Sequence, residues 1–271
     1  MKTRILVAAV GLPLLLVVLL VPTPIPTAVT VALMCIIGAY ELMFNTGLAK
    51  HIRLLVYACV MAIGICVWSV TGTSHTLGRL FAILFLIALF AEMLAAHTNL
   101  KLRTVCVALL AGAVIPYLLS ALIRIRCFEN GAFYVLVPLI LSMVPDSGAY
   151  FVGKAMGKHK LAPVISPKKT VEGAIGGLIA GALAMVLYGL ILQLFFKFSV
   201  NYFFAVCFGL IGSAVSVFGD LSFSVIKRQT KIKDFGNLLP GHGGILDRFD
   251  STSFVAPVTE VLLLLIPFAV K

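Results

Sequence analysis

The stretch PGHGGILDRFD, residues 240–250, gathers residue types that bind phosphate or metal in an otherwise apolar chain. Its relevant members are His242, Gly243, Gly244, Asp247, Arg248 and Asp250. If a helix begins near Leu246, the two aspartates lie three residues apart on one face of it. The paired glycines precede this helix, so their amide groups can form an anion-binding nest. The histidine binds phosphate, acts as an acid or only shapes the loop, and the sequence leaves these three roles open.

All the aspartates of the chain lie after residue 145. Asp220 lies near the end of the apolar run 202–226, and Asp146 interrupts another apolar stretch. A carboxylate in the middle of a membrane costs about 2.5–3.5 kcal/mol on insertion scales, so it usually faces a polar cavity, a metal or a cation. We therefore predict that Asp220 joins the two aspartates of residues 240–250 in an oxygen-rich site for Mg²⁺. The alternative is a solvated or lysine-paired aspartate.

The segment SPKKTVEG, which starts at Ser166, has the pattern of a second anion site. Lys168 and Lys169 present adjacent ammonium groups, and Thr170 is placed to cap the helix that follows. The first turn of that helix offers free amide groups to a phosphate. A basic, capped helix start without a ligand gives the same pattern. Glu172 either binds a metal or complements the helix dipole, and the three glycines that follow at four-residue spacing indicate a close helix-packing seam.

The chain has the composition of a polytopic membrane protein. Of its 271 residues, 61% are hydrophobic and 11% are charged, with a mean hydropathy of +1.13, whereas about one quarter of a soluble domain is charged. A membrane-spanning helix needs about 20 apolar residues. Because backbone groups in lipid must be paired within the segment, we predict an all-α fold. About nine transmembrane helices are expected: 5–21, 27–44, 54–71, 78–96, 104–123, 132–153, 172–196, 200–226 and 252–270.

The distribution of charge predicts which side of the membrane the polar loops face. With nine spans, five of the 21 lysines and arginines fall on the side opposite the N-terminus: Arg79, Arg124, Arg126, Lys197 and Lys271. By the positive-inside rule the N-terminus and the loops 154–171 and 227–251 are then cytoplasmic. The net charge of +11 suits anionic lipid headgroups and anionic substrates. We expect residues 1–131 to be scaffold helices and residues 132–271 to be the catalytic region.

The polar segments together indicate one kind of chemistry. Cationic groups hold phosphates, carboxylates hold a divalent metal, and glycines let the backbone approach a ligand closely. All of these groups are expected at one membrane surface. The residues therefore point to metal-assisted phosphoryl or nucleotidyl transfer onto a lipid.

Residues 224–250 resemble the signature of the phosphatidate cytidylyltransferases, the CDP-diacylglycerol synthases. The matching pattern is S-x-I-K-R-x4-K-D-x-G-x2-L-P-x-H-G-G-I-x-D-R-F-D. The segments DSGAYFVGK, from Asp146, and SPKKTVEG resemble upstream parts of the same family. The similarity covers roughly residues 145–251, and the N-terminal helices match only in being apolar.

The resemblance implies an enzyme that joins CTP to phosphatidic acid, giving CDP-diacylglycerol and pyrophosphate, with Mg²⁺ and a paired cation that can be K⁺. It assigns metal-ligand positions to Asp220 and Asp247, with Asp250 nearby, and Asp146 and Glu172 match further family positions. The predicted catalytic residues are Asp220, Lys227, His242, Asp247, Arg248 and Asp250. The predicted binding residues for the phosphates of CTP and the lipid are Ser166, Lys168, Lys169, Thr170, Ser224, Arg228, Lys233, Gly243 and Gly244.

No protein nucleophile is expected, because positioning and charge neutralisation supply most of the catalysis of phosphoryl transfer. The resemblance further implies a bacterial inner-membrane protein and a homodimer, and the charge distribution predicts an active site that faces the cytoplasm. Nucleic acid is not an expected partner. One alternative is a CTP-dependent membrane kinase of the polyprenol or phytol type, which would release CDP. A transporter of anionic solutes is the other, although no inverted repeat supports it.

Overall fold

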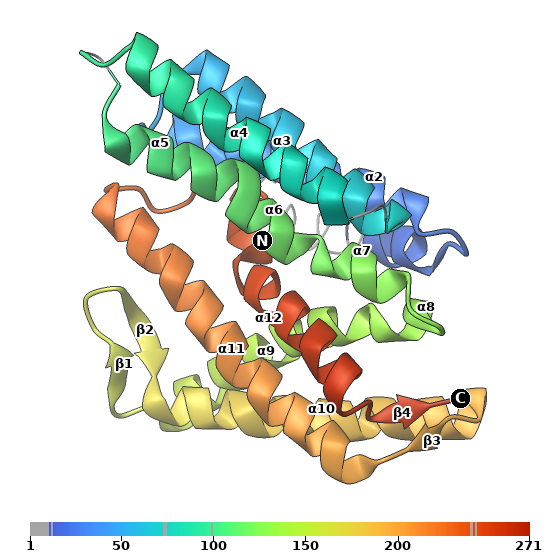
Figure 1. The fold of residues 1–271 in the computed structure, drawn as a ribbon. Coiled ribbons are helices and arrows are strands. Elements are labelled where there is room, and N and C mark those ends of the chain that lie inside the picture. Colours follow the sequence, from blue (N-terminus) through green and yellow to red (C-terminus); the bar gives the residue numbers. More distant parts are fainter. Residues whose placement is uncertain (1–10, 12, 73–74, 99, 239–240, 242) are drawn as a thin grey trace. The chain divides into compact units, whose positions relative to one another are not determined.

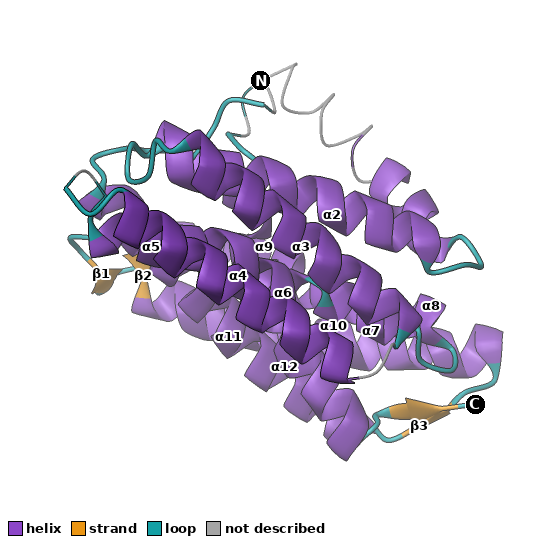
Figure 2. Cartoon of the chain, turned by 45° about the horizontal axis from the view of Figure 1, so that its top comes forward, coloured by secondary structure: helices purple, strands orange, loops and turns teal. Residues whose placement is uncertain are grey.

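The computed structural model describes residues 11–271 except 12, 73–74, 99, 239–240 and 242. Helices make up most of the described chain, and the strands form two short two-stranded sheets (Figure 2). The chain divides into two compact units. The first unit contains residues 1–128 and 229–249, and the second contains residues 129–228 and 250–271. The segment 229–249, which we expected in the catalytic region, therefore packs with the N-terminal helices.

The first unit is a bundle of apolar helices, of which α3 and α4 run side by side (Figure 1). Its elements are α2 (Ile25–Tyr40), the π-helix η1 (Glu41–Asn45), α3 (Ile52–Thr71), α4 (His75–Ala95), α5 (Leu102–Leu109), the π-helix η2 (Leu110–Val114), α6 (Ile115–Leu119) and α7 (Ala121–Arg126). Small residues allow the helices to approach closely: a Cβ atom on Gly112 would lie 2.6 Å from the Cα atom of Ala58. The α5–η2–α6–α7 series forms one long apolar segment, Leu102–Arg126.

The second unit is built around a pair of long helices, α9 and α10, that pack along each other (Figure 1). Its elements are α8 (Gly131–Tyr134), α9 (Leu136–Met156), β1 (Lys160–Ala162), β2 (Ser166–Thr170), α10 (Val171–Phe196), β3 (Ser199–Val200), α11 (Tyr202–Gln229), most of α12 (Leu246–Leu265) and β4 (Ala269–Val270). The predicted glycine seam is present, because Cβ atoms on Gly173 and Gly177 would lie 2.8 Å and 2.9 Å from backbone oxygens of α9. Glycine is required there for the two helices to approach.

Seven helices in the described residues are long and apolar enough to span a membrane: Ile25–Asn45, Ile52–Thr71, Thr76–Ala95, Leu102–Arg126, Gly131–Met156, Val171–Phe196 and Tyr202–Gln229. They match seven of the expected spans to within a few residues, which indicates a mainly helical integral membrane protein. The first expected span, 5–21, falls mostly on residues that lie outside the described part.

The last expected span, 252–270, differs from the structure. Helix α12 covers Leu246–Leu265, and the chain then forms strand β4 at Ala269–Val270. This helix is not among the seven spans, because its first two turns carry charged and hydroxyl side chains. Its start at Leu246 confirms the position expected from the sequence, so Asp247 and Asp250 both lie near its N-terminus.

Candidate active site

In the second unit, the side chain of Asp220 forms an ion pair with the ammonium group of Lys169. Asp220 lies on α11 and Lys169 on strand β2, and the two side chains are equally shielded, each 24% exposed. The hydroxyl of Ser224, one turn further along α11, donates to Asp220 Oδ1 at 3.4 Å. Three residues that the sequence assigned to the site therefore come together at the β2 end of α11.

Asp250, on α12, is a buried carboxylate that belongs to the same unit. Helices α11 and α12 pack tightly here, since a Cβ atom on Gly219 would lie 3.1 Å from the Asp250 carbonyl oxygen. Burial raises the pKa of Asp250 to about 7, and the negative charge of Asp220 is the next contribution. The charge of Asp146 also raises this pKa, whereas the Ser251 amide and Lys227 lower it. A buried acid beside other carboxylates favours a nearby positive charge.

The donor set around Asp220 and Asp250 fits a hard cation. The described residues contain no group of three or more His, Cys, Asp or Glu side chains in position to hold one metal ion. Mg²⁺, however, is usually held by one or two carboxylates together with substrate phosphates and water, not by a cage of protein ligands. Two oxygen donors beside Lys169 and Lys227 are thus compatible with a metal that arrives with a nucleotide. Mg²⁺ and K⁺ remain predictions.

The SPKKT residues form strand β2, which pairs antiparallel with β1. Successive side chains of a strand point to opposite faces, and accordingly Lys169 is half-buried against Asp220 while Lys168 is exposed. The two ammonium groups therefore do not act as one adjacent pair. Thr170 caps α10 as expected, because its hydroxyl accepts from the Gly173 amide at 3.1 Å.

Glu172 is engaged with the β1 side of this hairpin. Its carboxylate accepts the amide groups of Lys158 and His159 at 3.1 and 3.2 Å. Its Oε1 atom also lies 2.6 Å from Nδ1 of the His159 ring. These contacts tie Glu172 to the residues just before β1. Its role as a metal ligand remains a prediction.

The other predicted cations of the second unit lie at the end of α11. Lys227 is buried, and Arg228 is exposed and donates from Nε to the Ile165 carbonyl at 3.1 Å. This last bond ties α11 to the turn between β1 and β2. Ser166 is half-buried in β2, and Asp146 is exposed on α9 directly after Pro145, which lies inside the helix.

In the first unit, Asp247 holds the signature segment 229–249 in shape. Its Oδ2 atom accepts the Phe235 amide at 2.7 Å and the Gly244 amide at 3.0 Å. Gly243 has φ +86°, and a Cβ atom there would lie 2.9 Å from Asp247 Oδ2. The Gly244 amide, which we expected to face a substrate anion, thus binds a carboxylate of the protein itself.

Two residues of the N-terminal helices, Glu41 and Asn45, also bind this segment. Glu41 is buried and accepts the amides of Ile245 and Leu246. Asn45 donates from Nδ2 to the Phe235 carbonyl at 2.8 Å. Neither residue was predicted from the sequence to belong to the site. The one available signal was the acidic residue Glu41 near the end of the apolar run 27–44, which we expected to reach the membrane interface and which is buried instead.

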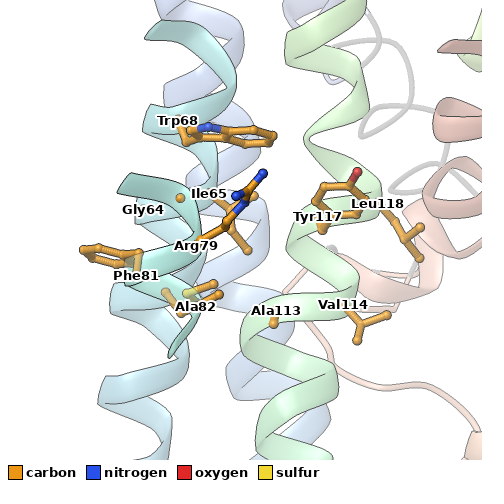
Figure 3. A pocket seen from close by; sticks show the side chains of 12 residues that line it. Gly64, Ile65, Trp68, Arg79, Phe81, Ala82, Ala113, Val114, Tyr117 and Leu118 are labelled. Carbon is orange, nitrogen blue, oxygen red and sulfur yellow. The ribbon is translucent and has the colours of Figure 1, made fainter. Parts of the chain in front are cut away.

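Of the remaining predicted residues in the first unit, Lys233 and Arg248 are exposed, whereas His242 lies outside the described residues. The first unit also contains an apolar cavity of about 500 Å³ between α3, α4 and the η2–α6 segment. Arg79 extends into it near Trp68 and Tyr117 (Figure 3). None of the residues predicted to do chemistry lines this cavity, so the polar site lies elsewhere.

The fold and the site define a multi-span helical membrane protein with carboxylates and cations on α11, α12 and a short hairpin. Comparison with known proteins agrees with this class. The chain belongs to the cytidylyltransferase family, whose model matches residues 2–266.

Similar individual proteins are bacterial enzymes named phosphatidate cytidylyltransferase. Those of Staphylococcus haemolyticus and Staphylococcus saprophyticus are each 44% identical to this chain over 136 residues, and that of Staphylococcus aureus is 46% identical over 136 residues. In each case the match covers 50% of this chain and 51% of the relative. The chain thus spans about half the length of the relatives it matches.

Proposed function

We propose that this protein transfers CMP from CTP to phosphatidic acid, forming CDP-diacylglycerol and releasing pyrophosphate. Membership of the cytidylyltransferase family supports the use of a cytidine nucleotide. The names of the partial relatives support phosphatidate as the acceptor. The observation that carries the proposal is the buried Asp250 beside the Asp220–Lys169 ion pair, because such a mixture of carboxylates and cations suits a metal–triphosphate complex.

The reaction needs no covalent intermediate with the protein. A phosphate oxygen of phosphatidic acid attacks the α-phosphorus of CTP, a new P–O bond forms, and the bond to the β-phosphate breaks so that pyrophosphate leaves. Asp220 and Asp250 would hold a divalent cation together with the substrate phosphates, and that cation would neutralise charge on the attacking and leaving oxygens. Lys169, Lys227 and Arg228 would orient the phosphates.

The environment of these residues supports that division of roles. Asp220 already pairs with the ammonium group of Lys169 in the structure, so the site favours a cation beside this carboxylate. Lys227 is buried, and a buried ammonium group interacts more strongly with phosphate than one in water does. Positioning and charge neutralisation together are the main sources of catalysis in phosphoryl transfer.

The same proposal includes the orientation of the protein and its location. The polar segments 154–171 and 227–251 would face the cytoplasm, because the positive-inside rule assigns most of the lysines and arginines to that side. We propose an integral protein of a bacterial inner membrane. Alkylation of single cysteines introduced at Lys168 and at Lys197, with a reagent that does not cross the membrane, tests this orientation, since the two positions should react from opposite sides.

The test of function uses the purified protein in detergent with phosphatidic acid, Mg²⁺ and CTP labelled separately at the α- and γ-phosphates. We expect the α label in the lipid and the γ label in pyrophosphate. Label that enters the lipid only from the γ position would instead identify a lipid kinase. No lipid label from either position, with Mg²⁺ and K⁺ both varied, would contradict the proposed function.

A further inference from the structure

Glu41 makes an unusual set of contacts for a carboxylate on an apolar helix. It is 2% exposed, and its two oxygens accept two consecutive amides, Ile245 at 3.0 Å and Leu246 at 2.9 Å. These amides open helix α12, where backbone N–H groups lack partners within the helix. A carboxylate at this end of a helix also interacts favourably with the helix dipole. Glu41 therefore acts as an external cap for α12, although more than 200 residues separate it from that helix.

The contact between Glu41 and the start of α12 is one part of a larger packing face. A Cβ atom on Gly38 would lie 2.9 Å from Leu246, and Cβ atoms on Gly236 or Gly244 would collide with the Glu41 carboxylate. Asn45 binds the carbonyl of Phe235, which is fully buried. Residues 38, 41 and 45 lie three and four positions apart, so they share one face of the α2–η1 helix. That face contacts the signature segment in three places.

The local helix geometry supports a functional purpose. Helix α2 changes to the π-helix η1 at Glu41 and keeps that form to Asn45. Both polar contacts thus come from the first and the last residue of η1. A π-helical turn is rare, is less favourable than an α-helical one, and occurs often at functional sites.

Glu41 and Asp247 together accept three consecutive backbone amides of one turn. Asp247 accepts the Gly244 amide, and Glu41 accepts the two amides that follow it. Phe235 is held in the same way from two sides, because its amide donates to Asp247 and its carbonyl accepts from Asn45. Loss of Glu41 would leave two buried or half-buried amides without an acceptor, and the turn that carries Asp247 would lose its fixed position.

We infer that Glu41 is a positioning residue for the reaction, which sets the geometry of Asp247 and Arg248 by holding the start of α12 from the N-terminal helices. The inference rests on the proposed function, and it assigns to residues 1–131 a part in the site in addition to their role as scaffold. Asn45 supports the same segment through Phe235.

The test compares Glu41→Gln with Glu92→Gln in the full-length protein. Gln has nearly the same size, but its NH₂ group would face an N–H donor, so at most one of the two amides keeps an acceptor. Glu92 belongs to the same unit and binds Arg53 and Tyr57, away from the signature segment. Three quantities are measured: hydrogen exchange of the amides of residues 244–246, kcat, and the Mg²⁺ concentration that gives the half-maximal rate.

We expect Glu41→Gln to speed exchange at residues 244–246 and to lower kcat by about 10- to 100-fold, the usual effect of removing a partner that orients a metal ligand. The Mg²⁺ requirement should rise. Asn45→Ala should likewise speed hydrogen exchange at Phe235, with a smaller loss of kcat. Glu92→Gln should leave all three quantities near those of the wild type. A purely structural role would reduce the yield of folded protein without changing the Mg²⁺ requirement.

Two results would overturn the inference. The first is unchanged exchange at residues 244–246 in Glu41→Gln, which would show that the carboxylate does not hold the turn. The second is faster exchange with wild-type kcat and Mg²⁺ requirement. Hydrogen exchange does not depend on which reaction the protein catalyses, and the labelled-CTP experiment uses the wild type. The two experiments therefore distinguish failure of the proposed function from failure of the inference about Glu41.

Discussion

Lys169 pairs with Asp220 and thereby joins strand β2 to helix α11 within the second unit. The neighbouring Lys168 points to the other face of the strand and is exposed. The two lysines, identical in type and adjacent in sequence, should consequently differ in function. Lys169 neutralises a carboxylate, whereas Lys168 is exposed.

The first prediction compares Lys169→Gln with Lys168→Gln. Loss of the Lys169 charge leaves Asp220 without its ion-pair partner and removes a cation from the site, so kcat/KM for CTP should fall by about 10-fold or more. Lys168→Gln should change it by less than about threefold, as is usual for an exposed charge. Steady-state rates with labelled CTP measure both. Equal losses in the two variants would contradict the assignment of Lys169 to the site.

The second prediction concerns the Thr170 cap. Thr170→Ala removes the hydroxyl that accepts the Gly173 amide, which should lower stability by about 1 kcal/mol. Because β2 ends at this residue, the loss should also loosen the position of Lys169. The temperature of thermal unfolding in detergent and the activity should both decrease. Thr170→Ser retains the hydroxyl and should behave like the wild type, and an equally large loss in that variant would point to the methyl group as the important feature.

Local patterns made much of this architecture predictable. Seven spans were found because hydropathy and length alone decide whether a helix suits a membrane, and the Thr170 cap and the start of α12 followed from residue type and spacing. The opposed directions of Lys168 and Lys169 were not predictable, because they depend on the pairing of a short polar hairpin. The Glu41 contact was not predictable either, since no sequence pattern links a helix residue to amides 204 positions away.

The third prediction concerns the pH dependence of stability at Asp250. The pKa of its buried carboxyl is raised to about 7 in the folded protein, above an unfolded value near 4. Between these two values the folded state binds more protons than the unfolded state, so stability should fall as pH rises from about 4 to about 7. Asp250→Asn removes this group and should flatten that part of the curve.

At pH 8 without Mg²⁺, Asp250→Asn should therefore unfold at a higher temperature than the wild type, by roughly 5 °C. It should also gain less stability when Mg²⁺ and CTP are added, because a ligand stabilises the state that binds it. Thermal unfolding across pH, with and without the two ligands, provides the measurement. If the variant is less stable than the wild type at pH 8, the side chain is stabilised by partners that outweigh the cost of its burial.

The last prediction separates the charge of Asp247 from its hydrogen bonds. One oxygen of this carboxylate accepts both the Phe235 and Gly244 amides. Asn keeps one carbonyl oxygen in the side chain, so Asp247→Asn can preserve both bonds while it loses the negative charge. Asp247→Ala loses the charge and the bonds together.

If Asp247 binds the metal, both variants should be inactive, with losses of at least about 100-fold, the upper end of the effect for partners that only support a metal ligand. They should differ in structure. Asp247→Asn should unfold at the wild-type temperature and retain slow hydrogen exchange at Phe235 and Gly244, whereas Asp247→Ala should lose both properties. Near-normal activity of Asp247→Asn at saturating Mg²⁺ would show instead that Asp247 serves the loop alone, and that the metal must then be held by Asp220 and Asp250 without it.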